Sequence, residues 1–257
     1  MTTNTSGVAQ ITPIAKSTDA AEVALATYDQ LLVLLHSLDD KAWRAATECP
    51  GWSVADMVGH LIGAAEANAS LRQNMRQQAW GARHRRDHCG NPLDAVNALQ
   101  VSEHRSLAPA ERVSMLSSLA PRAVAGRMRL PRLLRRVSVP IAQSGSSAGM
   151  PPRLRLGHLV DVIYTRDVWM HTLDIARATG GEVDLSAPVN ARIVADVVRE
   201  WALLHGQPVD LTLTGPCGGR FVSGAGAQRL ELDAAQFCRA LSGRAPGQGL
   251  LRQLVIF

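Results

Sequence analysis

Three side chains of the kind that bind divalent metals stand in two separate stretches of this 257-residue sequence. Asp167 and His171 are four residues apart, so both project from one face if that stretch is helical. His60 lies in another stretch with apolar residues at helical spacing, which predicts that its ring faces a helical bundle or its margin. Three protein ligands with one open position are typical of a catalytic zinc site. These residues could therefore form a divalent metal site, for which zinc is the expected ion.

The same spacing has a simpler interpretation. An Asp and a His four residues apart can form only a hydrogen bond with each other, worth about 0.5–1.5 kcal/mol. Asp174 follows His171 by three residues. It could accept a hydrogen bond from the His171 ring and orient it, or it could be a surface or capping carboxylate. Spacing alone leaves these interpretations open.

The helix that carries His60 has a well-marked start. Residues 49–52, Cys-Pro-Gly-Trp, form a turn, and Ser53 then precedes Asp56 by three residues. This arrangement resembles a capping box, in which two side chains satisfy the free backbone donors of a first helical turn. We expect His60 to lie in the second turn of that helix.

The other helices follow from apolar periodicity. A long helix over about 158–179 carries the other two ligands and stops at Gly180. A first helix is predicted over about 18–38, and another from about 92 with a break near Pro109. Residues 80–91 and 143–152 read as loops from their composition. Facing helices of such bundles are known places for metal sites.

The character of the sequence changes beyond Pro188, where strand-like alternation begins to mix with helical stretches. We predict a helix, three strands and a short helix, over 189–205, 209–215, 219–224, 229–232 and 233–241. The expected fold class is mostly α, a four-helix bundle followed by a small α+β domain. The predicted organisation is a flexible tail over 1–17, the bundle over 18–184 and the α+β domain over 185–257.

Positive charge is concentrated in one part of the chain. The net charge is +5, and residues 121–156 contain no Asp or Glu but eight arginines: Arg122, Arg127, Arg129, Arg132, Arg135, Arg136, Arg153 and Arg155. A solvated basic surface, an anionic small ligand or nucleic acid could each account for such a run. The run lacks interleaved aromatic residues and a helix-turn-helix pattern, which argues against nucleic acid.

The four cysteines show no CxxC spacing, which argues against a zinc ribbon or a thioredoxin-type site. The N-terminus does not resemble a signal peptide, and no apolar run reaches the length of a membrane span. We therefore expect a cytoplasmic protein with free thiols and no membrane partner. Cys49 lies just before the His60 helix, but the sequence fixes no basic or histidine partner beside it.

Two motifs resemble those of a known family. Residues 49–61, CPGWSVADMVGHL, resemble the PGW-S/T-x-x-D-x-x-x-H-L signature of the actinobacterial mycothiol-dependent maleylpyruvate isomerase family, which belongs to the DinB/YfiT-like metal-binding bundles. Residues 166–180, RDVWMHTLDIARATG, are similar to the family's E-x-x-x-H-x-x-D-I-x-x-A-x-G helix. Residues 213–221 and 237–244 resemble parts of its small C-terminal domain. The resemblance extends over about 20–245.

The resemblance implies which residues form the site. It implies a zinc ion held by His60, Asp167 and His171, with Asp167 standing where the family has Glu. Because Asp is one methylene shorter, the helix must lie closer or the ion must shift. It also implies a catalytic arginine from the C-terminal domain, which we assign to Arg244, with Arg239 or Arg220 as alternatives. Asp174 is the candidate second carboxylate of the site.

The resemblance further implies an activity. Mycothiol would be the thiol cosubstrate, and a thiol bound to Zn²⁺ loses its proton. The resulting thiolate would attack an electrophilic small molecule, giving isomerisation if the sulfur leaves again or S-transfer if it stays. Arginines of 121–155, or Arg244, could bind a carboxylate of either reactant. The alternative is a non-catalytic protein, DinB-like or sterol-carrier-like, that binds a small ligand.

Overall fold

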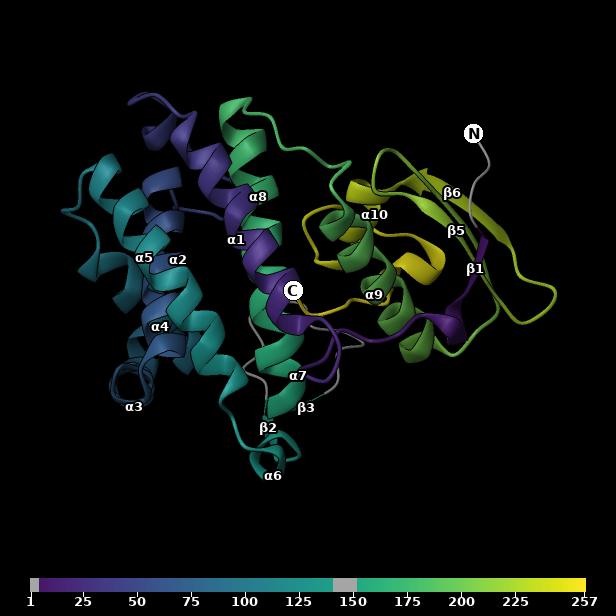
Figure 1. Cartoon of the computed structure of the whole chain (residues 1–257), viewed down its shortest axis with the longest axis horizontal. Coiled ribbons are helices and arrows are strands. Elements are labelled where there is room, and N and C mark those ends of the chain that lie inside the picture. Colours follow the sequence, from purple (N-terminus) through teal and green to yellow (C-terminus); the bar gives the residue numbers. More distant parts are fainter. Residues whose placement is uncertain (1–4, 141–151) are drawn as a thin grey trace. The chain divides into compact units, whose positions relative to one another are not determined.

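The computed structural model describes residues 5–140 and 152–257, which fall into two compact units (Figure 1). The helical unit contains the described residues of 19–140 and 152–183, and the C-terminal unit contains 5–18 and 184–257. The helical unit ends at Val183, and the chain continues into the C-terminal unit at Asp184.

Four helices of the helical unit enclose one apolar core. They are α1 (Ala20–His36), α2 (Val54–Ala69), α5 (Pro109–Met128) and α8 (Tyr164–Thr179). Each helix contributes buried apolar side chains to a shared cluster, which includes Leu31, Leu61, Leu116 and Val168. Burial of such faces is the main source of helix stability in a bundle. The core fixes the faces of α2 and α8 that point inward, and those faces carry the predicted metal ligands.

The start of α2 is fixed by the predicted capping box. The Asp56 amide donates to Ser53 Oγ over 3.2 Å, and the Ser53 amide donates to Asp56 Oδ2 over 3.0 Å. An N-cap of this type is worth about 1 kcal/mol. It sets the first turn of α2, and His60 follows in the second.

The long helix predicted from residue 158 is interrupted. It consists of a short turn, α7 (Leu156–His158), a π-helical stretch over Leu159–Ile163, and α8. Asp161 in the π-helical stretch accepts two hydrogen bonds from Arg135 Nη1, both of 2.6 Å. The helix ends at Gly180, which has φ +70°, a left-handed conformation that glycine adopts without strain. Periodicity does not reveal the π-helical stretch, because it inserts only one extra residue per turn.

Two further helices, α3 (Leu71–His84) and α4 (Pro92–Glu103), lie outside the apolar core cluster (Figure 1). They pack against each other and against α2. The loop predicted over 80–91 is wrong in its first half, since α3 continues to His84 and a 3-10 turn follows over Arg85–His88. The polar surface of α3 gives no apolar stripe to recognise, and packing on α4 supplies the stabilisation instead.

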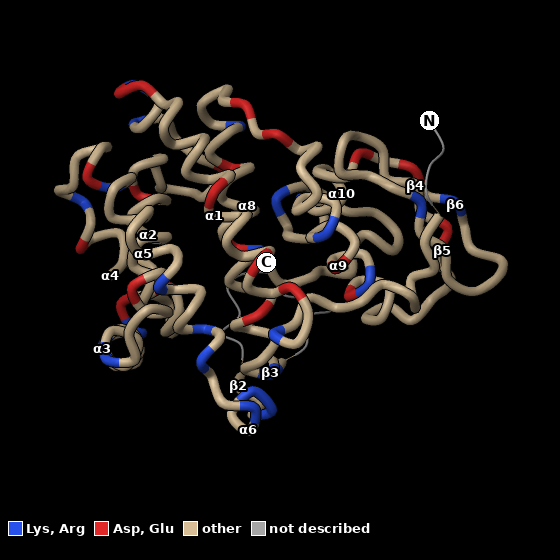
Figure 2. Tube along the Cα trace, in the orientation of Figure 1, with Lys and Arg blue, Asp and Glu red and all other residues tan. Residues whose placement is uncertain are grey.

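The basic run forms the end of α5, the short helix α6 (Arg132–Arg135), and a two-stranded ribbon of β2 (Ser138–Pro140) and β3 (Arg153–Arg155). Figure 2 shows its arginines as blue segments around α6. The loop predicted over 143–152 lies outside the described residues except for Pro152.

The C-terminal unit contains a four-stranded sheet in the order β1-β5-β4-β6. Its elements are β1 (Thr5–Gly7), α9 (Pro188–His205), β4 (Val209–Thr214), β5 (Gly219–Ser223), β6 (Arg229–Asp233) and α10 (Ala234–Leu241). β4 pairs antiparallel with β5 and parallel with β6. On β4 the apolar residues alternate inward as predicted, and α10 packs against β4 and β6.

The N-terminal segment differs from the predicted flexible tail. Residues 5–7 form β1, which pairs parallel with β5, and the Ile14 amide donates to Asp196 on α9 over 2.9 Å. Val8 and Ile14 are buried. A three-residue strand is too short for alternation to be visible in the sequence, so tertiary pairing decides its conformation.

The observed architecture confirms the predicted fold class, a mostly α protein with a helical bundle followed by a small α+β domain. Within residues 5–140 and 152–257, no helix combines the length and the apolar character needed to cross a bilayer.

Candidate metal centre

The three predicted metal ligands converge between α2 and α8. Asp167 Oδ2 lies 3.5 Å from His60 Nε2, and Asp167 Oδ1 lies 3.4 Å from His171 Nε2. One donor atom from each of the three residues lies within 4.8 Å of the other two. Residues from two distant stretches therefore present two imidazoles and a carboxylate to one point.

Each imidazole lies about as far from one oxygen of Asp167 as two ligands of a tetrahedral metal ion lie from each other. A tetrahedron with bonds of about 2.0–2.1 Å, the usual length for zinc to nitrogen or oxygen, has corners about 3.3–3.4 Å apart. The two measured separations are 3.4 and 3.5 Å. The shorter side chain of Asp167 thus reaches both imidazoles without a rearrangement of the helices. A divalent ion placed here would keep a fourth position for an outside ligand.

The charge and burial of these three side chains favour the binding of a cation. The side chains of His60 and His171 are 9% and 8% exposed, and that of Asp167 is 26% exposed. Burial opposes the ionisation of Asp167, but attraction to His171 and its hydrogen bond, with a smaller effect of the nearby His60, hold its pKa well below the usual range. Burial also opposes the charging of His171, yet Asp167 and Asp174 raise its pKa well above the usual value. Without metal, the site therefore holds a carboxylate and an imidazolium.

Asp174 lies behind His171 and not on the helix surface. Its side chain is fully buried, and its Oδ2 accepts a hydrogen bond of 3.0 Å from His171 Nδ1. This contact leaves Nε2 of His171 facing Asp167. The geometry is that of a carboxylate that orients a metal-binding imidazole, and the effect of Asp174 on metal binding stays a prediction.

Two residues of the turn before α2 also lie at the site. The Trp52 ring centroid is 5.2 Å from that of His60 and 6.4 Å from that of His171. The Cys49 thiol lies within 4.8 Å of donor atoms of His171 and Asp174. No partner for Cys49 could be predicted from the sequence, because only the fold of the turn brings it to α8. The sequence feature that could have indicated Trp52 and Cys49 is the Cys-Pro-Gly-Trp turn, which directly precedes α2.

A further contact was not predicted. His60 Nδ1 donates to Gln100 Oε1 over 2.8 Å, and Gln100 lies on α4. A glutamine on an amphipathic helix carries no sequence signal for such a role. Its hydrogen-bond partners determine which nitrogen of His60 is free.

The candidate arginines have different environments. Arg244 belongs to the C-terminal unit, where its amide donates to the Arg239 carbonyl over 2.9 Å. Arg239 is buried, and Arg220 pairs with Asp210 on the neighbouring strand at 3.2 Å. A catalytic role for Arg244, or for either alternative, stays a prediction.

The basic run is more than a solvated surface. Arg127 on α5 is only 3% exposed and donates from Nη1 to Thr165 Oγ1 over 3.3 Å. In the described part of the chain, its Nε and Nη2 atoms have no hydrogen-bond partner. Arg135 is bound to Asp161, as noted above. Two of the eight arginines are therefore engaged in the interior of the helical unit.

The sequence model of the mycothiol maleylpyruvate isomerase N-terminal domain matches residues 24–176, which is more than half of the chain and includes all three ligands. The chain belongs to the mycothiol maleylpyruvate isomerase family. No curated protein matches the sequence. Among solved structures, that of the mycothiol-dependent maleylpyruvate isomerase superposes with a TM-score of 0.53 at 14% identity, covering 93% of this chain and 92% of that one. A histidine-to-alanine variant of that isomerase gives 0.54 at the same identity and coverage. These structures share the fold with this member of the family.

Proposed function

We propose that this protein is a zinc-dependent enzyme that uses mycothiol as its thiol cosubstrate to attack an electrophilic small molecule in the cytoplasm. The observation that carries the proposal is the convergence of His60, Asp167 and His171, whose donor atoms lie within 4.8 Å of one another, with each imidazole 3.4–3.5 Å from an oxygen of Asp167. Membership of the mycothiol maleylpyruvate isomerase family supports the choice of thiol.

Each residue of the site would have its own role. The two imidazoles and Asp167 would hold the ion, which supplies a thiolate at neutral pH by lowering the pKa of a bound thiol. Asp174 would keep the His171 ring in place through its Nδ1. Trp52 would cover one side of the two rings and keep water from that side.

The thiolate can act in two ways. Addition of sulfur to an activated cis double bond, rotation about the resulting single bond and expulsion of the sulfur would give isomerisation, with the thiol regenerated. Displacement of a leaving group by the sulfur would give S-transfer, with the thiol consumed. Arg244 remains our candidate for the catalytic arginine.

An anionic electrophile fits the charge around Arg127. Burial raises the pKa values of Tyr28 and Tyr164, while Arg127 lowers them and Asp167 raises them, so both charges lie near the two phenols. A buried cation whose Nε and Nη2 groups have no hydrogen-bond partner among the described residues is costly, and a carboxylate from a ligand would satisfy them by charge-assisted hydrogen bonds. We therefore propose Arg127 as the residue of the basic run that binds a substrate carboxylate.

The alternative is a non-catalytic small-ligand protein. A cavity of about 440 Å³ in the C-terminal unit, lined by residues including Ala191, Thr212 and Phe221, gives such a ligand a place. The alternative would need no chemistry at the metal centre.

Cobalt substitution distinguishes the two functions. The protein loaded with Co²⁺ is titrated with mycothiol, and then maleylpyruvate and a panel of activated alkenes are added. The proposed enzyme shows a thiolate-to-cobalt charge-transfer band and turns over at least one electrophile. Absence of the band would overturn the proposed role of the metal, and a band without turnover of any electrophile would support the binding protein.

A further inference from the structure

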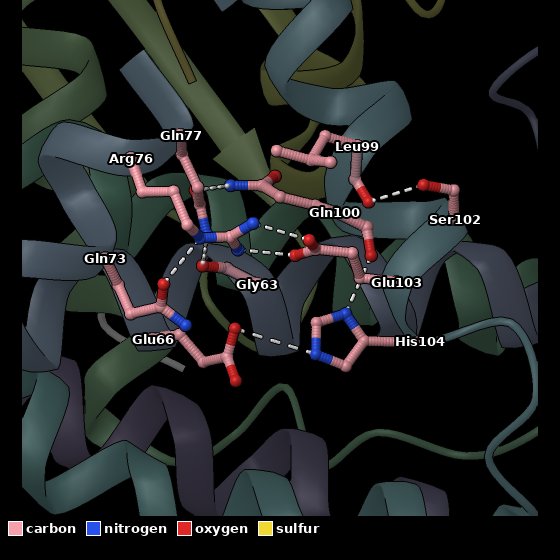
Figure 3. Close-up of polar contacts among 10 residues, drawn as sticks. All are labelled: Gly63, Glu66, Gln73, Arg76, Gln77, Leu99, Gln100, Ser102, Glu103 and His104. Atoms are coloured by element: carbon pink, nitrogen blue, oxygen red, sulfur yellow. Dashed lines mark hydrogen bonds and ion pairs between the residues drawn. The ribbon is translucent and has the colours of Figure 1, made fainter. Parts of the chain in front are cut away.

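A chain of three hydrogen bonds leads from His60 away from the metal centre. His60 Nδ1 donates to Gln100 Oε1 over 2.8 Å, and Gln100 Nε2 donates to Gln77 Oε1 over 2.8 Å. Gln77 Nε2 then donates to the Gly63 carbonyl over 2.9 Å. Figure 3 shows the two glutamines side by side with Gly63 beneath them. His60, Gln77 and Gln100 are 7%, 0% and 4% exposed, so water does not compete for these bonds.

The last acceptor fixes the direction of the whole chain. A backbone carbonyl can only accept, so Gln77 must point its NH₂ group at Gly63 and its oxygen at Gln100. Gln100 must then point its own NH₂ group at Gln77 and its oxygen at His60. A carbonyl oxygen accepts only from an N–H, so His60 must carry a proton on Nδ1. The lone pair of neutral His60 is therefore on Nε2, the atom that faces Asp167.

We infer that Gln100 and Gln77 are positioning residues that hold His60 in its metal-binding tautomer, with the Gly63 carbonyl as the fixed end of the relay. The inference rests on the metal site proposed above. It also gives α3 and α4 a structural role. These helices contribute nothing to the apolar core cluster, but they position the two glutamines.

The surrounding packing keeps the relay in register. A Cβ on Gly63 would lie 2.6 Å from Cγ of Gln100, so only glycine lets α4 approach α2 this closely. The Gln100 carbonyl accepts from His104 Nδ1 over 2.7 Å, and His104 Nε2 lies 3.7 Å from Glu66 on α2 (Figure 3). Both the backbone and the side chain of Gln100 are thus held close to α2.

A second contact joins α3 to α4. Arg76 donates to both carboxylate oxygens of Glu103, with two distances of 2.6 Å (Figure 3). The pair is partly exposed, so its contribution to stability is screened and small. Its geometry nevertheless keeps the two helices that carry the relay in one register.

An amide suits His60 because a carboxylate already stands behind His171. A divalent ion with Asp167 and a bound thiolate is neutral, and buried Asp174 adds one negative charge to this cluster. A second buried carboxylate behind His60 would add a further negative charge to the cluster, which is costly in the interior. Glutamine orients the ring and adds no charge.

The test replaces each glutamine of the relay by an apolar side chain of similar length. The variants are Gln77→Met and Gln100→Met, and Gln78→Met, an exposed neighbour on α3, is the control. Two quantities are measured in each protein: the tautomer of His60 in the metal-free state, by ¹⁵N NMR of the imidazole, and the zinc Kd, by competition with a chelator.

We expect the wild-type protein and Gln78→Met to show neutral His60 with its proton on Nδ1 and equal zinc affinity. Both relay variants should lose this preference and bind zinc about 10–100-fold more weakly, as for other partners of metal-binding histidines. A wild-type His60 protonated on Nε2, or folded relay variants with unchanged tautomer and Kd, would overturn the inference. If the wild-type protein binds no zinc, the proposed function is wrong. The measured tautomer of His60 still tests the inference about Gln77 and Gln100.

Discussion

The imidazole rings of His60 and His171 meet edge to face, with centroids 5.5 Å apart and planes at 85°. Each ring has its Nδ1 engaged by an acceptor on the side away from Asp167, Gln100 for one and Asp174 for the other. Both Nε2 atoms therefore approach Asp167 in fixed orientations. Such an arrangement lowers the conformational cost of binding an ion, because the ligands are ordered beforehand.

Zinc binding should release about one proton at neutral pH. The pKa of His171 is raised well above its usual value by Asp167 and Asp174, so the metal-free ring is protonated, while Asp167 is already ionised. The zinc affinity should consequently fall as the pH falls. Calorimetric titration in buffers of different ionisation enthalpy measures the released protons, and zinc binding without proton release would contradict the assignment of His171.

Replacing Asp174 by asparagine should weaken zinc binding by about tenfold. The amide can still accept from His171 Nδ1, but it no longer carries the charge that makes the ring a better donor to the metal. Chelator competition measures the change, and Asp184→Asn in the C-terminal unit is a matched control. An unchanged zinc Kd in folded Asp174→Asn would show that the buried carboxylate has only a structural role.

Arg127→Met should raise KM for an anionic electrophile by about 10–100-fold, the value of one charged hydrogen bond at about 1.5–3 kcal/mol. Zinc content should not change, because Arg127 is not a ligand. Arg122→Met, an exposed position on the same helix, serves as control. Steady-state kinetics measures the effect, and equal KM values for Arg127→Met and the control would remove Arg127 from the substrate site.

The contact between His104 and Glu66 should make part of the stability depend on pH. Burial lowers the pKa of His104, but hydrogen bonds with Glu66 and the Gln100 carbonyl outweigh it and raise the pKa above its usual value. A raised folded pKa stabilises the fold fully below the unfolded pKa, about 6.5, and this contribution is lost as pH rises through the folded value.

The corresponding variant is His104→Gln, compared with the wild type by urea denaturation at several pH values. The difference in unfolding free energy between the two proteins should shrink as the pH rises from about 6 upward. A difference that stays constant or grows over this range would mean that His104 is neutral in the fold.

The sequence indicates the three candidate ligands because their chemistry is distinctive. Asp167 and His171 share a helical face, and the capping box at Ser53 fixes the turn of α2 on which His60 lies. Helical period and donor type are local properties, so one sequence suffices to read them. That Asp167 reaches both imidazoles despite its shorter side chain could not be predicted from the sequence, because only interatomic distances show it.

The parts that escaped prediction depend on tertiary packing. Gln77 and Gln100 become a relay only because α3 and α4 pack on α2 in one register, and glutamine has no preferred structural role. The strand over residues 5–7 exists only through its pairing with β5. Cys49 meets His171 only through the fold of the turn before α2. None of these contacts leaves a periodic trace in the sequence.

The metal content of the purified protein tests the central claim most directly. Elemental analysis should find about one zinc per wild-type chain, as expected for a site of this geometry. His60→Ala and His171→Ala should each abolish it, while His36→Ala, at an exposed histidine on α1, should retain it. Wild-type protein without a bound divalent metal after zinc loading, or either ligand variant with undiminished metal, would contradict the account.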